Sequence, residues 1–505
     1  MTRGLFYCNI KGLKSMERNG NMKKIISLIL AVALVFTAST SAFAAQDVKS
    51  TTEYDGLPVI IVRGIDFAGL TYADGSKALQ LEFSTIFSLL LKSFTARMKI
   101  MSIDDLLSTV FDTAKGVLSP IACDKEGNSI EDVSMVQYHG SMAKHPDFVE
   151  NLGNGGEEGI VKTAVERYGA ENTYYFTYDW RKTPQQIATE LDEFVQTAKN
   201  DSGKSQVNII CASMGGMVTT AYMHYFGTEN INSAVYLSGA QNGTYVCGDA
   251  LNGRIEFQPA TIRELVESLT DNNIIYSAML YLFDALGAFS YLTGTINRLV
   301  DNSFEEANDV VLRDCMGTLC GFWSLCPDDD FDSGIETIFG AHREEYPVLL
   351  EKLEGVREFV MSTEETLTNA KENGVKISFV SNYNIGLVPV YERANLNGDM
   401  VLETELTSNF ATVAPLGKKL SNVQMATAES KYVSPDKVIN ATTALFRDNT
   451  WFVKDAPHVA ADYGSGFSDF TFTLLESEVQ PEVTMFKEYP QFMFADTMLN
   501  VYPLK

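Results

Sequence analysis

A serine stands at the turn between a predicted strand and a predicted helix. The apolar run 207–211 leads into the turn, Ser213 occupies it, and Gly215 follows in a helical segment. A nucleophile elbow of this kind strains the serine backbone, so the residues two positions before and after it must be small. Cys211 replaces the usual first glycine, and its small size makes this tolerable. The pattern predicts Ser213 as a nucleophile for acyl transfer, with the N–H of Met214 as an oxyanion donor; the alternative is a glycine-rich turn with an incidental serine.

Histidine, the usual general base for such a serine, occurs only five times in the chain. In this arrangement the serine comes first along the chain, then the acid, then the histidine. Four histidines do not fit this order. His139 and His145 precede the serine, His224 lies on the helix that follows it, and His342 precedes the late strands. His458 follows the last predicted central strand, 450–454, within a loop. It is therefore the predicted base, and the alternative is a loop histidine with a surface hydrogen bond.

The acid of the triad should lie between the strand predicted at 375–380 and the strand at 450–454. Asp399 fits, since it follows the first of these strands by about twenty residues. Three other carboxylates remain open as alternatives: Glu392, Glu403 and Asp436. Asp462 is a fourth, but only if the acid follows the histidine along the chain.

A second oxyanion donor should come from the loop that follows the strand predicted at 57–62. The N–H of Ile65 is the expected donor, and Gly64 would allow the backbone to approach the substrate. Asp66 would oppose a developing negative charge, so its carboxylate is expected to point away from the site.

The elements that must position these residues alternate between short β-branched runs and helical stretches. Strands are predicted at 57–62, 173–178, 206–211, 231–237, 375–380 and 450–454. Helices are predicted at 79–98, 103–114, 184–199 and 214–226. Strand–helix alternation is typical of a mainly parallel sheet flanked by helices. The alternation stops between 245 and 373, where a helical insertion would form a cap over the active-site edge of an α/β-hydrolase fold, whose core would comprise 45–244 and 374–505.

The segment Tyr178-Asp179-Trp180-Arg181, about thirty residues before the serine, resembles a motif of the lecithin:cholesterol acyltransferase family, which includes lysosomal phospholipases. The resemblance extends through scattered motifs from about 58 to 458. It implies an acyl-enzyme mechanism on acyl esters, commonly of lipids, with Ser213, Asp399 and His458 as the triad. Three positions depart from the family pattern: Arg63, Ala212 and Met400. The alternative is a structural role for Asp179 and Arg181, as a charge pair beside the elbow.

The N-terminal region predicts export. Residues 22–44 combine two lysines, an apolar run and a small-x-small cleavage site, as in a secretory signal peptide, and the run is too short to be a membrane anchor. Residues 1–21 would be an upstream extension that is untranslated or unstructured. An exported protein permits disulfides among four cysteines of the insertion, although no pairing follows from the sequence: Cys247, Cys315, Cys320 and Cys326.

The net charge of −26 disfavours nucleic acid and anionic membranes as partners. No cofactor or metal is predicted, because no ligand spacing supports one. The favoured function is a secreted lipase, phospholipase or acyltransferase-like esterase whose cap presents Leu282, Phe283 and Phe289 to an acyl chain, unless these residues merely belong to a buried cap helix. Two alternatives remain: an esterase of small soluble or carbohydrate esters, and a catalytically degenerate fold that acts by binding.

Overall fold

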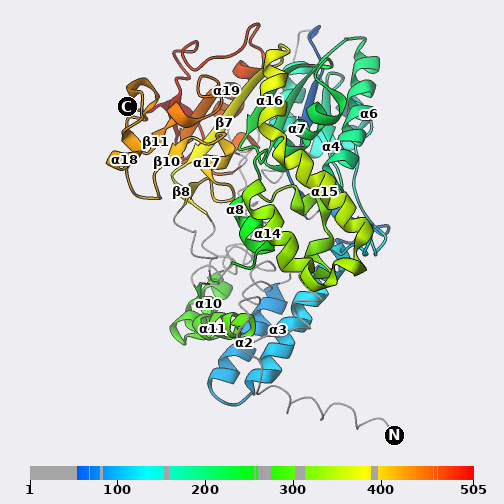
Figure 1. Cartoon of the computed structure of the whole chain (residues 1–505), viewed down its shortest axis with the longest axis vertical. Helices are drawn as coiled ribbons and strands as arrows, with labels where there is room; N and C mark the ends of the chain where they lie inside the picture. The colour runs from blue at the N-terminus through cyan, green and yellow to red at the C-terminus, as the bar shows by residue number, and fades with distance from the viewer. Residues whose placement is uncertain are drawn as a thin grey trace.

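An eight-stranded sheet forms the centre of the computed structural model (Figure 1). The structure describes residues 54–505 apart from 68, 80–82, 153–158, 255–257, 260–262, 264–273, 302–312, 388–395, 459 and 463–464. The strands of this sheet are β1 (Val59–Val62), β4 (Thr173–Phe176), β5 (Val207–Ala212), β6 (Ile231–Leu237), β7 (Lys376–Tyr383), β12 (Thr450–Lys454), β13 (Phe492–Ala495) and β14 (Val501–Pro503). Their order is β14-β13-β12-β7-β6-β5-β1-β4, and only the pair β13–β14 is antiparallel.

The central strands are apolar on both faces, as expected for a parallel sheet that is covered on each side. In β1, Ile60 and Val62 belong to one buried cluster, whereas Val59 and Ile61 belong to another on the opposite face. The six predicted strands are confirmed, with differences of a few residues at their ends. The strands β13 and β14 were not predicted, because they lie in a short aromatic tail without clear alternation.

Helices cover both faces of the sheet and create a three-layer arrangement. Helices α6 (Pro184–Ser202), α7 (Met214–Phe226) and α16 (Thr363–Glu372) contribute buried residues to the cluster on one face. Helices α5 (Gly159–Tyr168) and α19 (Ser465–Leu475) cover the other face. Local sequence defines the ends of these helices: α6 begins with a capping box between Thr183 and Gln186 and ends at Gly203 in a left-handed conformation.

The described parts of 245–373 contain helices and no strand. They are α8 (Tyr245–Leu251), α10 (Ile274–Ala285), α11 (Ala288–Asp301), α13 (Cys320–Trp323), α14 (Asp328–Phe339), α15 (Pro347–Met361) and α16. The insertion contacts the loops at the strand ends, since the N–H of Gly321 donates to the carbonyl of Arg181 at 3.1 Å. The domain boundaries drawn from the sequence stay a prediction.

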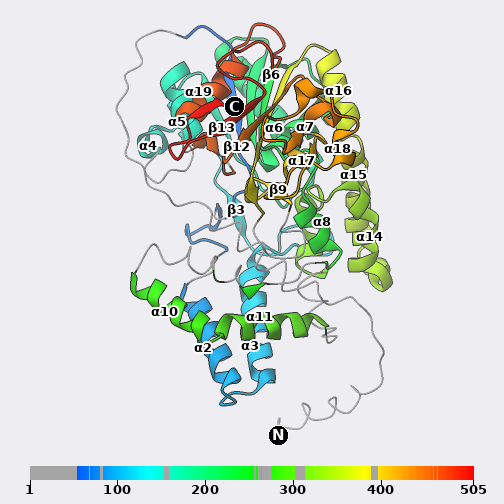
Figure 2. The same cartoon turned by 90° about the vertical axis from the view of Figure 1, so that its left-hand side faces the viewer.

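A four-helix lobe lies at the end of the molecule away from the sheet (Figures 1 and 2). Helices α2 (Phe83–Arg97) and α3 (Ile103–Leu118) pack there against α10 and α11. The sequence analysis included α2 and α3 in the core segment 45–244, but the structure places them beside helices of the insertion. The reason is that apolar helix faces need partners, and α10 and α11 supply them, with Phe87 and Phe283 in edge contact at 5.3 Å.

Smaller elements lie in the connections. They are β2 (Leu70–Tyr72), β3 (Val133–Met135), α4 (Pro146–Asn151), β8 (Ile385–Gly386), β9 (Asn397–Gly398), α17 (Thr404–Thr407), β10 (Thr412–Val413), α18 (Asn422–Met425) and β11 (Ile439–Asn440). Of these, the antiparallel pair β8–β9 matters most for the site, because it leads directly into Asp399.

The cysteines expected to permit disulfides are buried free thiols in the structure: Cys247, Cys315, Cys320 and Cys326. Within the described residues, no helix combines the length and apolarity that a bilayer crossing requires. The same residues contain no group of three or more side chains suited to hold a metal ion. The predicted upstream extension and signal peptide, 1–21 and 22–44, lie outside the described residues.

Candidate active site

Ser213 stands at a strained turn between β5 and α7. Its φ is 54° and its ψ is −129°, a conformation that residues with a side chain rarely adopt and that costs of the order of 1–3 kcal/mol. Three backbone hydrogen bonds hold it. Its N–H donates to the carbonyl of Leu237 at 3.2 Å, and its carbonyl accepts from the N–H groups of Ala240 at 2.7 Å and Gly216 at 2.9 Å. The end of β6 therefore supports the turn.

Three glycines make room for this turn. A Cβ atom on Gly215 would lie 2.4 Å from the carbonyl oxygen of Val62, and one on Gly216 would lie 2.9 Å from the Cα of Gly239. A Cβ atom on Gly64 would lie 2.8 Å from the Cβ of Ser213 and 3.3 Å from its Oγ. The loop after β1 thus borders the serine hydroxyl. The small residues that the sequence pattern singled out are a steric requirement of the elbow.

Asp399 and His458, which are 59 residues apart, are joined by two hydrogen bonds. The Nδ1 of His458 lies 2.8 Å from the Oδ2 of Asp399, and the main-chain N–H of His458 donates to the carbonyl of Asp399, also at 2.8 Å. The neighbouring loop is held by Asn382 on β7, whose side chain donates to the carbonyl of Pro457 at 2.9 Å. These contacts fix both the ring and the loop that carries it.

The carboxylate of Asp399 is buried and accepts from its own loop. Its Oδ1 accepts from the N–H groups of Val401 at 3.1 Å and Leu402 at 2.8 Å. Burial raises the pKa of Asp399, but the His458 imidazole, the N–H of Leu402 and the hydroxyl of Ser238 together lower it below its ordinary value of 3.8. The carboxylate is therefore ionised at neutral pH and can orient an imidazole and stabilise its cation.

Met400 adopts a φ of 92° between Asp399 and Val401. A positive φ of this size favours glycine, which has no Cβ to clash in the left-handed region. We expect Met400→Gly to raise the free energy of unfolding by about 0.5–1 kcal/mol, because the side chain is partly exposed and loses little packing. Urea unfolding measures this. Val423→Gly, an exposed helical position, serves as the control and should destabilise the protein; a loss of stability in Met400→Gly would contradict the strain argument.

Ser213, Asp399 and His458 each follow a strand of the same parallel set, β5, β7 and β12, so they lie at the carboxyl edge of the sheet. Ser238 links the ends of two of these strands, because it follows Leu237, whose carbonyl accepts from the serine N–H, and its own N–H donates to the carbonyl of Val380 on β7 at 2.8 Å. The Nε2 of His458 is buried and has no hydrogen-bond partner among the described residues, Ser213 included. The structure thus joins Asp399 and His458 by a direct contact, and their roles as acid and base stay predictions.

The loop that carries Ile65 is held from two sides. The N–H of Arg63 donates to the carbonyl of Phe176 at 3.2 Å, and the hydroxyl of Tyr178 donates to the carbonyl of Arg63 at 3.0 Å. The carboxylate of Asp66 binds the Arg63 guanidinium at 3.2 Å and the N–H of Gly69 at 2.9 Å. The positive charge of Arg63 thus offsets the negative charge of Asp66, which would otherwise oppose an oxyanion in the site. The donor roles of Ile65 and Met214 stay predictions.

Tyr178→Phe tests whether this loop matters for the reaction. We expect kcat for ester hydrolysis to fall by about ten-fold with little change in KM, because a loosened oxyanion donor weakens transition-state binding. Steady-state kinetics measure the two constants separately. Tyr222→Phe is the matched control, since its buried hydroxyl binds Asn230 and Asp192 instead. Equal kinetics for wild type and Tyr178→Phe would show that the contact is only structural.

Asp179 and Arg181 form the charge pair that the structural alternative described. The guanidinium of Arg181 is buried and binds the carboxylate of Asp179 at 2.7 Å, the hydroxyl of Ser129 at 2.8 Å and the carbonyl of Val133 at 3.2 Å. The pair therefore attaches the segment around β3 to the end of β4. Of the four motif residues, two have side chains that contact the loop after β1: Tyr178 donates to the carbonyl of Arg63, and the ring of Trp180 packs edge-on against Phe67 at 4.8 Å.

The alternative acids and histidines have other partners where the structure describes them. Asp436 binds Lys454 at 2.9 Å and Ser434 at 2.6 Å, and Glu403 accepts from Thr244 at 3.2 Å. Glu392 and the side chain of Asp462 lie outside the described residues. Three of the remaining histidine rings have other partners: His224 contacts Ser362, His342 contacts Glu345, and His145 contacts the carbonyl of His139.

Glu403 is a buried carboxyl that the sequence analysis considered only as a rival acid. Burial raises its pKa from 4.5 to about 8, and nearby Asp399 adds to the increase, although hydrogen bonds from Thr244 oppose it. It is therefore protonated at neutral pH. No pattern in the sequence distinguishes it, because carboxylates of an acidic chain are usually solvated.

The raised pKa of Glu403 predicts how stability depends on pH. The native state keeps a proton that the unfolded state releases above about pH 4.5, so the free energy of unfolding should fall between about pH 5 and pH 8. The slope from this group is at most about 1.4 kcal/mol per pH unit. Urea unfolding of Glu403→Gln across this range should lack that decline, and parallel curves for the two proteins would contradict the assignment.

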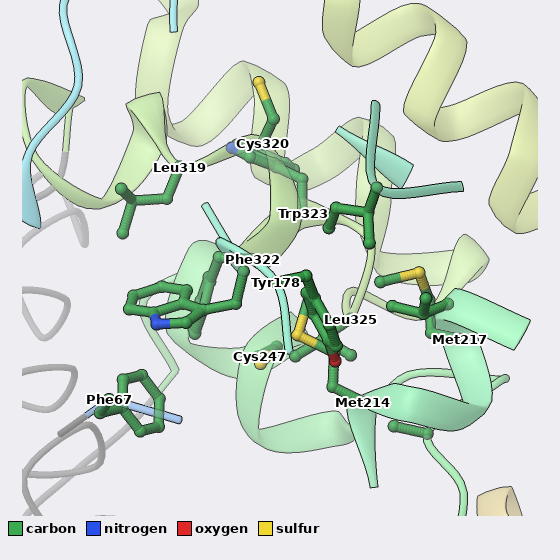
Figure 3. Close-up of a cluster of buried hydrophobic side chains, with 14 of the residues drawn as sticks. Phe67, Tyr178, Met214, Met217, Cys247, Leu319, Cys320, Phe322, Trp323 and Leu325 are labelled. Carbon is green, nitrogen blue, oxygen red and sulfur yellow. The ribbon is translucent and has the colours of Figure 1, made fainter. Parts of the chain in front are cut away.

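A buried apolar cluster lies beside the elbow, as Figure 3 shows. It combines residues of the loop ends, of α7 and α8, and of the segment around α13: Phe67, Tyr178, Met214, Met217, Cys247, Leu319, Cys320, Phe322, Trp323 and Leu325. The sequence analysis had expected an apolar wall from α10 and α11. The structure instead buries Phe283 and Phe289 within the helical lobe, leaves Leu282 exposed, and places α13 next to Met214. The burial of Phe283 and Phe289 fits the alternative of a buried cap helix, because helical periodicity does not tell which partner an apolar face will cover.

No protein-family model matches the chain, and no curated protein matches it. Among solved structures, the Tle4–Tli4 complex is 11% identical with a TM-score of 0.35 and covers 76% of this chain and 88% of that one. An esterase (EaEST) from Exiguobacterium antarcticum is 12% identical with a TM-score of 0.16, and the match covers 43% of this chain and 88% of the esterase. A carboxylesterase structure from Nitrososphaera gargenis is 11% identical with a TM-score of 0.15, with the same two coverages.

The strand order and the elbow identify the fold without those similarities. A mainly parallel sheet carries a serine turn after β5, an acid loop after β7 and a histidine loop after β12. This is the chain order and layout of an α/β-hydrolase. The chain has the α/β-hydrolase fold.

Proposed function

We propose that the chain is a serine hydrolase that cleaves or transfers the acyl groups of carboxylic esters through an acyl-enzyme. The observation that carries this proposal is the contact between Asp399 and His458 at 2.8 Å, at the sheet edge that also bears the strained Ser213. The ring nitrogen opposite Asp399 is buried and unoccupied among the described residues, so it is available for the proton of a nucleophile.

In this mechanism His458 accepts the proton of Ser213 as its Oγ attacks the ester carbonyl. The tetrahedral oxyanion receives hydrogen bonds from the N–H groups of Met214 and Ile65. His458 then donates the proton to the departing alcohol, and water or a second alcohol releases the acyl group by the same steps in reverse.

The substrate class that we propose is an ester with an apolar acyl chain. The cluster around Met214 and Phe322 supports it, because an acyl chain next to Ser213 would be bordered by apolar rather than charged side chains. We further propose that the chain is an exported relative of the lecithin:cholesterol acyltransferase family. The Tyr178–Arg181 segment and the Asp399 loop support this relationship.

Labelling with a fluorophosphonate probe tests the nucleophile. The wild-type protein should form one covalent adduct, which mass spectrometry should locate in the peptide containing Ser213, and Ser213→Ala should form none. A wild type that does not react would favour the binding role instead. A series of p-nitrophenyl esters then tests the acyl chain, since a maximum at acetate would contradict the apolar substrate class.

A further inference from the structure

The four-helix lobe exposes an unusual number of large apolar side chains. They lie on α2 and the turn after it, and on α10: Leu91, Met98, Ile100, Met279, Tyr281, Leu282 and Leu286. Ile100 is 77% exposed, Tyr281 67%, and Met98 and Leu282 58% each. We define these seven residues as the lobe patch.

The two parts of the lobe patch lie next to each other. The guanidinium of Arg97 donates to the carbonyl of Leu286, so the C-terminal end of α2 touches the turn between α10 and α11. Met279 and Leu282 on α10 and Leu286 directly after it are spaced by three and four residues, as on one helix face. Exposed apolar residues nearly 200 positions apart in the sequence are thus brought close together.

The turn after α2 alternates cations with apolar residues in the order Arg97, Met98, Lys99 and Ile100. Lys99 has a φ of 59°, and this left-handed residue ends the helix. All four side chains are exposed. Cations interleaved with apolar side chains are typical of a surface that enters the headgroup region of a lipid layer, where cations meet phosphates and apolar groups meet acyl chains.

The charge of the lobe differs from that of the whole protein. Residues 83–118 and 274–301 carry five basic and five acidic residues, whereas the whole chain has a net charge of −26. The lobe also lies at the end of the molecule away from the sheet (Figure 2). A phospholipid surface with zwitterionic headgroups would therefore meet an apolar surface on a lobe without net charge, and the acidic rest of the protein would lie farther from it.

We propose that the lobe patch docks the protein onto phospholipid surfaces with zwitterionic headgroups. The proposal builds on the proposed function, because it presents the hydrolase to ester lipids. The same buried cluster includes Leu280 and Phe289 of the lobe as well as Met214 of the elbow, so the docking surface and the site belong to one packed body.

The experiment measures co-sedimentation with sucrose-loaded phosphatidylcholine vesicles. The chain from Gln46 onward contains every described residue, and the Ser213→Ala form of it prevents hydrolysis of the vesicles. Ile100→Ser with Leu282→Ser should weaken binding by about ten-fold or more. The matched control is Val423→Ser with Val479→Ser, two exposed apolar positions outside the lobe, which should bind as the parent does.

Equal binding of the test and control variants, or a parent that does not bind, would overturn the proposal. Sedimentation velocity without lipid tests whether the lobe patch instead binds a second copy of the chain. If the parent is a dimer and the double variant Ile100→Ser with Leu282→Ser is a monomer, the lobe patch is a dimer interface and the lipid proposal is wrong. Fluorophosphonate labelling of Ser213 needs no lipid, and vesicle binding needs no catalysis. Failure of the docking and failure of the proposed function are therefore distinguishable.

Discussion

His458→Ala should lower kcat for a soluble p-nitrophenyl ester by about 10⁴–10⁶-fold, the largest effect that we expect from a residue other than Ser213. The imidazole is the group that bonds the ionised Asp399 at 2.8 Å, and its free nitrogen faces no other partner among the described residues. Without it, the hydroxyl of Ser213 has no base to accept its proton. Steady-state hydrolysis measures the loss, and KM should change little because the ring does not bind the acyl chain.

His224→Ala is the matched control for this result. Its ring contacts Ser362 at 3.0 Å on the cap side of α7 and should leave kcat unchanged. If added imidazole partly restores the kcat of His458→Ala, the variant has lost its general base and its site is still folded. Loss of less than about ten-fold would contradict the assignment of His458, even if Ser213 is labelled.

The elbow could be predicted from the sequence because its requirements are local. Ser213, Gly215 and the preceding strand lie within a few residues, and the steric need for glycine arises from the end of β1. His458 and Asp399 were identified by chain order and by the scarcity of histidine. Their contact distance, however, depends on the β8–β9 pair and on Asn382, and no spacing in the sequence specifies those contacts.

Other features depend on long-range packing and had no signal of their own. The positive φ of Met400 has no signal in the sequence, because a residue with a long side chain disfavours that conformation. The partners of α2 and α3 lie in α10 and α11, far along the chain, so periodicity indicated helices but not the lobe. The ion pair between Arg63 and Asp66 is different, because i and i+3 side chains are close in a turn and their spacing is a local signal.

Buried polar groups were the least predictable part of the site. The Tyr178 hydroxyl and the Glu403 carboxyl owe their roles to burial beside the loops of Arg63 and Asp399. In a chain with 65 acidic residues, most carboxylates are solvated, so sequence alone gives none of them priority. Burial changes this, because an ionisable group without water must find a hydrogen-bond partner or keep its proton.

Asp399→Asn should lower kcat by about 10³–10⁴-fold while leaving the labelled serine in place. An asparagine has nearly the same shape and can still accept from the N–H groups of Val401 and Leu402, but it lacks the charge that stabilises the His458 cation. The change also affects stability, because the pKa of Asp399 is lowered in the folded state. The wild type should lose free energy of unfolding as pH falls below about 4 towards that lowered pKa, and Asp399→Asn should lack this part of the decline.

Asp436→Asn separates the catalytic from the structural part of this prediction. Asp436 also has a lowered pKa, since Ser434 and Lys454 stabilise its charge against the cost of burial, but its hydrogen bonds go to Ser434, Lys454 and Tyr383 and not to His458. Its replacement should change acid stability and leave kcat nearly intact. If Asp399→Asn retained kcat while His458→Ala lost it, the orienting acid would be another residue, and Glu403→Gln would be the next variant to assay. If Asp399→Asn and Asp436→Asn lost activity equally, the loss would come from weakened loops and not from the missing negative charge beside His458.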